Sequence, residues 1–423
     1  MPRRTRLNVE PLEARITPVA GALDPSFSGD GVVTQDLAGY YQTGGQDVVV
    51  QPDGKVVVAG TAKLLETSYP AVFRYNTDGS LDTTFGLNGV GVLTVPSGTG
   101  DFYSVALQAD GKIVASGTGR IGGNYQALVA RLNADGSPDT SFGTAGMTLV
   151  NASPGDDNGF AVAIQADGKV VATGNAQPNP TFASYRTLIL RLTTDGVLDP
   201  TFDGDGVALL TVGPLAKAVL VQSDGKIVVA GGQALPSSGA FVLARVNVDG
   251  TPDTTFGTNG SVSTSPGGMY FDEIRDAVLL PDGSILAAGV AGVGSSYRPT
   301  PILLKYTTTG ALDSTFGTSG VVATVLPHNG GSFEAVALQD DGKIVAAGGI
   351  GIPGGGNAIV ARFTAEGQLD TTFGAPGATA LPGAAMTDLA PNDNDGYSGV
   401  AVSPDGRIVA AGGAGGGSVR RLA

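Results

Sequence analysis

The sequence predicts an all-β fold: a seven-bladed β-propeller with four antiparallel strands in each blade, its ring closed by the N-terminal strand completing the C-terminal blade. Three observations lead to this fold. A block of the type Leu81–Gly86 recurs seven times, a second block containing Asp-Gly recurs in phase with it, and the apolar runs are short, β-branched and punctuated by glycine. The phenylalanines of the first block are Phe27, Phe85, Phe142, Phe202, Phe256, Phe316 and Phe373, at spacings of 58, 57, 60, 54, 60 and 57 residues.

Each repeat contains four candidate strands, which the second complete repeat illustrates. The first strand, 104–108, is turned by Asp110-Gly111 into the second strand, 112–115. An Asp-Gly pair between two apolar runs predicts a tight hairpin, because both residue types tolerate positive φ. The third strand is 127–132, and after a corner at 139–142 the fourth strand is 147–150.

The aspartates of the hairpin turn occur once in each repeat. They are Asp53, Asp110, Asp167, Asp224, Asp282, Asp341 and Asp405. Seven four-stranded units, each too short to form a domain alone, predict one continuous ring over residues 19–423 with a repeat of about 57 residues.

A constant interval shows how the ring closes. In six repeats a basic residue of the third strand precedes the corner aspartate by eight positions. The pairs are Arg74 and Asp82, Arg131 and Asp139, Arg191 and Asp199, Arg245 and Asp253, Lys305 and Asp313, and Arg362 and Asp370. Joining Ala423 directly to Val19 places Asp24 eight positions after Arg421, so the N-terminal strand, about 31–36, is predicted to complete the last blade.

The same constancy predicts structural roles for these residues. We expect one ion pair between the basic residue and the aspartate in each blade, and a corner phenylalanine wedged between blades.

The Gln-x-Asp-Gly-Lys and Leu-Asp-x-x-Phe-Gly motifs resemble those of the delta-60 repeat family, bacterial repeats expected to form β-propellers. The resemblance covers residues 23–423 and implies no catalytic residues. Departures, such as Ser284 in place of the turn lysine, fall at turn positions.

Residues 1–18 lie outside the predicted ring. The segment Leu12-Glu13-Ala14-Arg15 is similar to the Leu-Glu-x-Arg N-terminal motif of certain bacterial surface proteins, where it is an export or sorting signal. This resemblance implies an extracellular or cell-surface location. The alternative is a disordered tail without a role in sorting.

Composition excludes several classes of function. The net charge of −14 argues against nucleic-acid and anionic-membrane partners, and no apolar stretch approaches the length needed for membrane insertion. There is no cysteine, and His328 is the only histidine, so thiol chemistry and multi-histidine metal sites are excluded. We expect a monomer.

The connections between the second and third strands, and between the fourth strand and the next blade, vary in length and are predicted to share one face. Aromatic residues gather there, and exposed tyrosines among Gly, Ser and Asn are typical of a recognition surface. The candidate partner-binding residues are Tyr40, Tyr41, Phe102, Tyr103, Tyr125, Tyr185, Tyr270, Tyr297 and Tyr397. The partner is expected to be a protein or a glycan, although these rings can also serve to cover the ends of the blades.

Two chemical alternatives accompany the binding hypothesis. Asp47, Asp276 and Glu334 precede or begin predicted first strands and can meet at the channel mouth, together with His328, as in a polysaccharide lyase or hydrolase. The segment 392–396 resembles part of a calcium loop, but Pro391 and Val402 occupy its first and twelfth positions and cannot be ligands. No cofactor is therefore assigned.

Overall fold

The structure is a computed structural model that describes residues 20–34, 42–64, 67–96, 98–180, 184–211, 213–233, 239–265, 272–293, 298–325, 330–352, 355–374, 381–388, 395–413 and 417–422. These residues form antiparallel β-strands and turns, and none of them is helical. The described part of the chain accordingly offers no helix long and apolar enough to cross a membrane. The predicted all-β class is confirmed.

The first three sheets follow one another along the chain and contain four strands each. The first contains β2 (Gln42–Val50), β3 (Val56–Leu64), β4 (Thr67–Tyr75) and β5 (Val90–Val92). The second contains β6 (Gly100–Leu107), β7 (Ile113–Ile121), β8 (Asn124–Leu132) and β9 (Met147–Val150). The third contains β10 (Asp157–Ile164), β11 (Val170–Asn179), β12 (Ser184–Leu192) and β13 (Val207–Leu210).

The next eight strands are two such groups, joined into one sheet by a single pairing of Gly232 with Glu273. One group is β14 (Pro214–Val221), β15 (Ile227–Gln233), β16 (Phe241–Val246) and β17 (Ser261–Thr264). The other is β18 (Glu273–Leu279), β19 (Ile285–Val293), β20 (Arg298–Tyr306) and β21 (Val321–Ala323).

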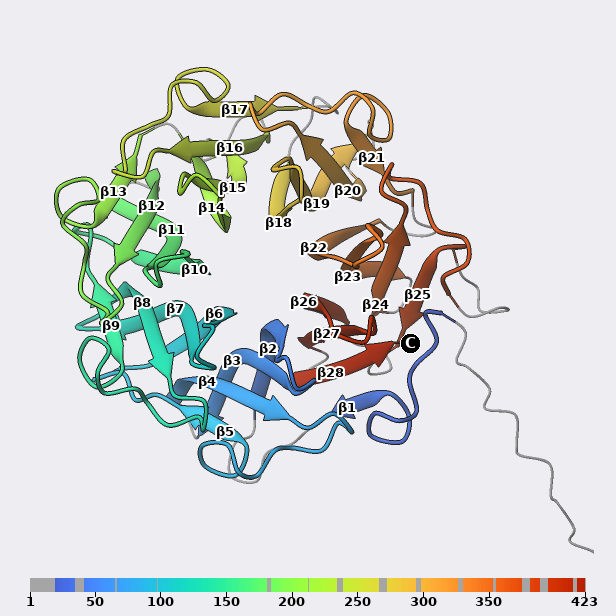
Figure 1. The fold of residues 1–423 in the computed structure, drawn as a ribbon, viewed down its shortest axis with the longest axis horizontal. Coiled ribbons are helices and arrows are strands. Elements are labelled where there is room, and N and C mark those ends of the chain that lie inside the picture. The colour runs from blue at the N-terminus through green and yellow to red at the C-terminus, as the bar shows by residue number, and fades with distance from the viewer. Residues whose placement is uncertain are drawn as a thin grey trace, which may run out of the picture.

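The last two sheets bring the chain back to its start. One contains β22 (Gly331–Leu338), β23 (Ile344–Ile352), β24 (Gly355–Phe363) and β25 (Ala384–Thr387). The other contains β26 (Gly396–Val402), β27 (Ile408–Gly413) and β28 (Gly417–Leu422), followed by β1 (Val32–Thr34) from the opposite end of the sequence. The sheets surround a central axis, with the first strand of each group innermost (Figure 1).

Contacts of the N-terminal segment reproduce those of an ordinary blade. Val33 of β1 pairs with Val419 of β28, and Leu23 forms a bridge with Leu422. The Gly374 N–H donates to the Ala20 carbonyl, as the Gly86 N–H does to the Asp135 carbonyl at another junction. The side chain of Arg421 lies outside the described part of the chain, so its predicted pairing with Asp24 is not tested.

The hairpin turns differ in one detail from the expectation. In the Asp110-Gly111 turn, Gly111 has a positive φ of 85°, whereas Asp110 does not. The aspartate instead accepts a hydrogen bond from the Lys112 N–H (3.1 Å) through its side chain. The two residues therefore have separate roles: the glycine adopts the positive φ that the turn requires, and the aspartate side chain accepts a hydrogen bond from a backbone N–H.

Some strands are longer than their apolar runs. In the second complete repeat, β7 continues to Ile121 and β8 begins at Asn124. Only Gly122 and Gly123 connect them, with φ values of 63° and 100°. The sequence pattern underestimates these strands because the apolar run is interrupted by small or polar residues, which are mostly buried in β7 and exposed at the start of β8.

The corner clusters confirm the predicted ion pairs. Arg131 Nε lies 2.7 Å from Asp139 Oδ2, and Lys112 Nζ lies 3.0 Å from the same oxygen. The Arg131 guanidinium also lies over the Phe142 ring (4.7 Å to its centroid) and donates to the Thr194 carbonyl of the next sheet. The pairs Arg74–Asp82, Arg191–Asp199, Arg245–Asp253, Lys305–Asp313 and Arg362–Asp370 repeat the contact at 2.7–3.0 Å.

The corner phenylalanines lie between neighbouring sheets, as predicted. Phe142 is fully buried, and a Cβ placed on Gly196 of the next sheet would lie 2.7 Å from its ring. Phe27, from the N-terminal segment, occupies the same position against Gly79. Because the glycine and the ring are in such close contact, a larger residue at either glycine would push the sheets apart.

Candidate binding site at the mouth of the central channel

The innermost strands share a β-bulge that determines which side chains reach the central channel. In β6 the pairing with β7 shifts register between Phe102 and Ser104, which leaves Tyr103 as the extra residue. The other innermost strands contain the same irregularity at the equivalent position. The bulged residues are Gln46, Tyr103, Phe160, Lys217, Arg275, Glu334 and Ser398, here called the channel-mouth ring.

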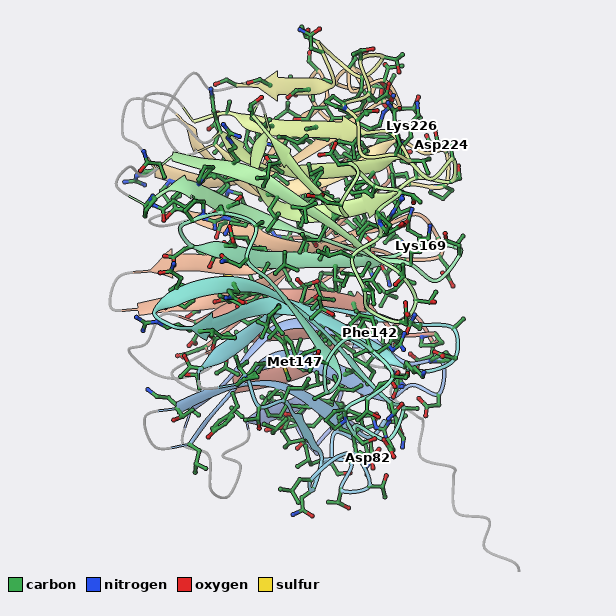
Figure 2. The ribbon with its side chains drawn as sticks, turned by 90° about the vertical axis from the view of Figure 1, so that its left-hand side faces the viewer. Asp82, Phe142, Met147, Lys169, Asp224 and Lys226 are labelled. Atoms are coloured by element: carbon green, nitrogen blue, oxygen red, sulfur yellow. The ribbon has the colours of Figure 1, made fainter. Side chains whose placement is uncertain are left out.

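The channel-mouth ring encloses a cavity of about 250 Å³, and all of its members line that cavity. Each of them is the third to fifth residue of its strand, so the ring lies near the strand starts. We call the face at which the innermost strands start the loop face. The opposite face carries the Asp-Gly turns and the corners and is called the corner face; Figure 2 shows Lys169, Asp224 and Lys226 lying toward one edge of the ring of sheets.

The bulge separates two adjacent residues that have different environments. Phe102, one position before the bulge, is fully buried in the core between sheets, whereas Tyr103 is half-buried and lines the cavity. Tyr397 holds the position of Phe102 in β26 and is only 1% exposed. The expectation that Phe102 and Tyr397 belong to an exposed recognition surface is therefore wrong, because the bulge turns only the following side chain toward the channel.

One side of the channel-mouth ring is aromatic and cationic. The Tyr103 and Phe160 rings lie 5.6 Å apart at an interplanar angle of 46°. The Lys217 ammonium lies 4.0 Å from the centroid of the Phe160 ring, a favourable cation–π position. Burial lowers the pKa of Lys217 and raises the pKa of Tyr103 to about 12, so the Tyr103 hydroxyl remains protonated and can donate a hydrogen bond.

The other side holds paired charges. Arg275 Nη2 lies 3.1 Å from Glu273 Oε2, and Arg275 Nε lies 3.6 Å from Glu334 Oε2. The Ser332 hydroxyl donates to Glu334 Oε1 at 2.5 Å. Arg275 therefore orients two carboxylates from neighbouring strands, and it also lines a second cavity of about 400 Å³, whose other walls come mainly from β19, β20 and β22–β24.

One residue deeper, polar side chains fasten neighbouring innermost strands. Asp47 Oδ2 accepts from the Val105 N–H (2.9 Å), and Asp276 Oδ2 accepts from the Val336 N–H (2.8 Å). Each aspartate also accepts, through Oδ1, from the backbone N–H that follows it. These bonds satisfy donors on the unpaired inner edge of a sheet, which is a structural role.

The two aspartates nevertheless have unusual acidity. Burial raises the pKa of Asp47, and burial together with the charge of Asp47 raises the pKa of Asp276 to about 7. The predicted carboxylates Asp47, Asp276 and Glu334 do line one cavity.

The remaining predicted partner-binding residues are distributed unevenly. Tyr125 is 40% exposed on β8, where the Arg120 guanidinium lies over its ring, and Tyr185 is half-buried on β12. Tyr40, Tyr41, Tyr270, Tyr297 and His328 lie outside the described residues. Most of the proposed calcium segment lies outside them too, and no group of three or more candidate metal ligands occurs within them.

Sequence reasoning missed Gln46, Phe160, Lys217 and Ser398. A signal for them exists, because each occupies the same position relative to the Asp-Gly turn of its repeat, seven residues before the aspartate. An alignment of the repeats on that turn identifies all seven residues of the channel-mouth ring. A search for aromatic residues in loops does not identify them, because these residues lie on strands and only one of them is a tyrosine.

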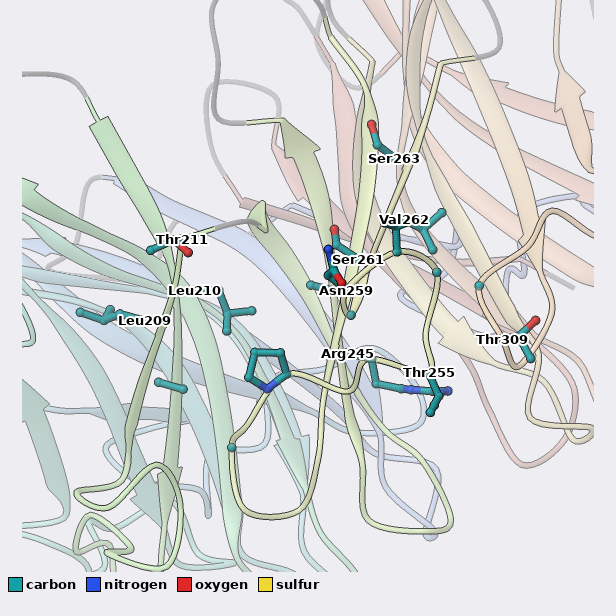
Figure 3. Close-up of a pocket in the computed structure, with 18 of the residues that line it drawn as sticks. Leu209, Leu210, Thr211, Arg245, Thr255, Asn259, Ser261, Val262, Ser263 and Thr309 are labelled. Atoms are coloured by element: carbon teal, nitrogen blue, oxygen red, sulfur yellow. The ribbon is translucent and has the colours of Figure 1, made fainter.

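A larger hollow lies on the outer wall and offers less chemistry. It has a volume of about 1030 Å³ and separates Leu209 and Leu210 of β13 from Ser261 and Val262 of β17 (Figure 3). Its arginine, Arg245, is already paired with Asp253 at 2.7 Å. Corner residues that recur in every repeat form much of its wall, so we regard it as a groove between blades.

The chain matches the sequence profile of the family described as "Domain of unknown function (DUF5122) beta-propeller". The matched segments are residues 51–85, 108–142, 165–202, 222–256, 280–316 and 339–373, just over half of the chain. The chain therefore belongs to this β-propeller family. The family match does not extend to the delta-60 designation or to the N-terminal motif, which remain predictions.

Several solved structures are similar to the chain at low sequence identity. The WD40 β-propeller domain of Doa1 is 14% identical, with a TM-score of 0.51 over 92% of this chain and 95% of that chain. Sqt1 from Chaetomium thermophilum is 12% identical (TM-score 0.47; 91% and 97% covered), and YCF48 from Cyanidioschyzon merolae is 12% identical (TM-score 0.45; 92% and 98% covered). No curated protein matches the chain. The likeness to Doa1 identifies the fold alone.

Proposed function

We propose that residues 19–423 form a seven-bladed, monomeric propeller, closed by β1, that acts as a non-enzymatic binding or scaffold module. The pairing of β1 with β28 supports the closure. So does the family match, whose six segments each run from just before an Asp-Gly turn to a corner phenylalanine. A seventh segment of this kind would be divided between the two ends of the chain, where a continuous profile does not find it.

The partner, a protein or a glycan, binds at the channel-mouth ring and the loop face around it. One observation carries this proposal: a shared bulge presents side chains of different size and charge at equivalent positions of the innermost strands. A recognition site can be built in this way, because the repeated bulge fixes the position of each side chain while its chemistry differs from blade to blade. Tyr125, exposed on the loop face and close enough to affect the pKa of Tyr103, extends the same surface.

A pull-down of the full chain against envelope polysaccharide and surface-protein fractions tests this function. The test variant is the triple substitution Gln46→Ala, Tyr103→Ala, Phe160→Ala. The matched control is Val197→Ala, Val248→Ala, because these exposed side chains lie in turns of the corner face. We expect the test variant alone to lose the partner. Equal capture by all three forms would place recognition elsewhere.

The protein is proposed to be exported or surface-associated on the basis of its Leu-Glu-x-Arg motif. Cell fractionation of the full chain and of a form lacking residues 1–18 tests the location. The motif acts in sorting if only the full chain reaches the envelope, and it has no such role if both forms distribute alike.

A second candidate function is that of a polysaccharide lyase or hydrolase. The observation in its favour is a carboxyl group, Asp276, whose pKa is raised to about 7 in the same cavity as Glu334. Against it, both oxygens of Asp276 already accept backbone hydrogen bonds. Turnover of envelope polysaccharide that disappears in Asp276→Asn, with partner capture retained, would favour the enzyme.

A further inference from the structure

The channel-mouth cavity combines three features that together specify a class of ligand: balanced charge, unused hydrogen-bonding groups and a small apolar corner. We propose that this cavity is a subsite for one uncharged sugar residue at the end of a glycan chain. The proposal rests on the proposed binding function and narrows its partner from protein or glycan to glycan.

The charges around the mouth argue for an uncharged ligand. At the mouth, Lys217 and Arg275 carry two positive charges, and Glu273 and Glu334 carry two negative charges. Asp47 and Asp276 also line the cavity, but burial raises the pKa of both and so favours their neutral forms. Arg275 is paired with both carboxylates, and the charges of Arg275, Glu273 and Glu334 all affect the pKa of Lys217. A ligand with a net charge would disturb this balance, whereas hydroxyl groups can donate to carboxylates and accept from cations without disturbing it.

Lys217 supplies donors that the protein leaves unused. Among the described residues its ammonium forms no hydrogen bond or ion pair, and it lies over the face of the Phe160 ring. The three N–H donors of this partly buried ammonium group favour a ligand that is rich in hydrogen-bond acceptors. The Gln46 and Ser398 side chains line the same cavity and add donors and acceptors.

The aromatic pair supplies the apolar contact that a sugar ring also needs. A sugar has polar hydroxyl edges and an apolar face of C–H groups, whose slight positive charge is attracted to the negative face of an aromatic ring. Tyr103 and Phe160 meet at 46° and so form an open corner rather than a closed stack. Phe160 is the only member of the channel-mouth ring without a polar side chain or terminal hydroxyl, which disfavours an apolar peptide anchor.

The size of the cavity limits its occupant to one sugar residue. The cavity of about 250 Å³ is smaller than the roughly 300–1,000 Å³ typical of sites for drug-sized ligands. A single terminal sugar fits this description, whereas the interior of a polysaccharide, which continues in both directions, does not. The rest of the glycan would lie over the loop face.

Saturation-transfer NMR and calorimetry on the full chain test the proposal. The probes are methyl glycosides of glucose, galactose, mannose and N-acetylglucosamine, with glucuronate as the acidic sugar and N-acetylphenylalanine as the peptide-like probe. We expect at least one neutral glycoside to bind, with affinity that changes little with salt because no net charge is paired. Phe160→Ala and Lys217→Met should each weaken it by about tenfold or more.

Lys343→Met provides the control, since Lys343 pairs with Asp341 on the surface of the corner face. It should leave glycoside affinity unchanged. The proposal is overturned if no neutral glycoside binds, if glucuronate or N-acetylphenylalanine binds more tightly, or if Lys217→Met binds like the wild type. If every sugar fails while the pull-down still succeeds and depends on the channel-mouth ring, the binding function stands and its partner is a protein.

Discussion

The two ends of each blade obey different rules. At the corner face, the same side chains recur from repeat to repeat in the same contacts, as in the pairs Arg74–Asp82 and Arg131–Asp139. At the channel mouth, the backbone bulge recurs but its side chain does not: a tyrosine in β6 becomes a lysine in β14 and a glutamate in β22. Side chains that recur in every repeat therefore indicate contacts that hold the blades together. Positions where only the backbone conformation recurs indicate sites whose side chains can differ between blades and so acquire a specific function.

Acidity separates the two ends as well. Lys112, Arg131 and Ser141 surround the corner carboxylate Asp139 with donors and hold its pKa well below the usual range despite burial. Asp276 in the channel receives only backbone donors and has a raised pKa. The charged form of the corner carboxylate Asp139 is thus stabilised within its blade, whereas burial in the channel favours the neutral form of Asp276.

The largest expected effect comes from removing the segment that completes the corner pattern. Deleting residues 1–37 eliminates β1, Phe27 and Asp24, which exposes the edge of β28. We expect the melting temperature to fall by on the order of 10 °C, measured by circular dichroism. Deleting residues 1–18 alone is the control and should leave the melt unchanged. An unchanged melt for the longer deletion would refute closure by β1.

Two corners allow the ion pairs to be compared. Arg131→Ala removes a buried guanidinium that contacts Asp139, Phe142 and the next sheet, and should cost about 3 kcal/mol of unfolding free energy. Lys305→Ala removes a more accessible partner of Asp313 and should cost about 1 kcal/mol or less. Urea titrations measure both. Equal losses would mean that burial does not distinguish these corners.

Adjacent residues at the bulge provide a sharper contrast. Phe102→Ala creates a cavity in the core and should cost about 3–5 kcal/mol. Tyr103→Ala, one residue later, faces the channel and should cost about 1 kcal/mol or less. The same titrations decide this comparison, and a reversed order would contradict the assignment of the bulge.

The last comparison concerns the pH dependence of stability. Between about pH 4 and pH 7, Asp276 is protonated in the folded protein but ionised in the unfolded chain. The free energy of unfolding of the wild type therefore falls as pH rises through this window. Asp276→Asn removes this titration, so the melting temperature of the variant relative to the wild type should rise across that window and level off above it. A difference independent of pH would show that Asp276 ionises normally.

The sequence predicted the corner end better than the channel end. Arg131, Asp139 and Phe142 belong to blocks that recur in the sequence, so their contacts could be predicted from spacing. The bulge left no such block, because it is a property of backbone pairing and tolerates any side chain. For that reason the sequence pattern predicts an exposed position for Phe102, which is buried, and does not single out Lys217.

Photocross-linking tests the central claim most directly. A photoreactive phenylalanine analogue replaces either Tyr103, in the channel-mouth ring, or Val248, 49% exposed on the corner face. Both forms are irradiated with the envelope fraction that supplies the partner. The account predicts adducts from position 103 and none from position 248. Adducts from position 248 alone would show that the repeated end, and not the varied end, is the recognition surface.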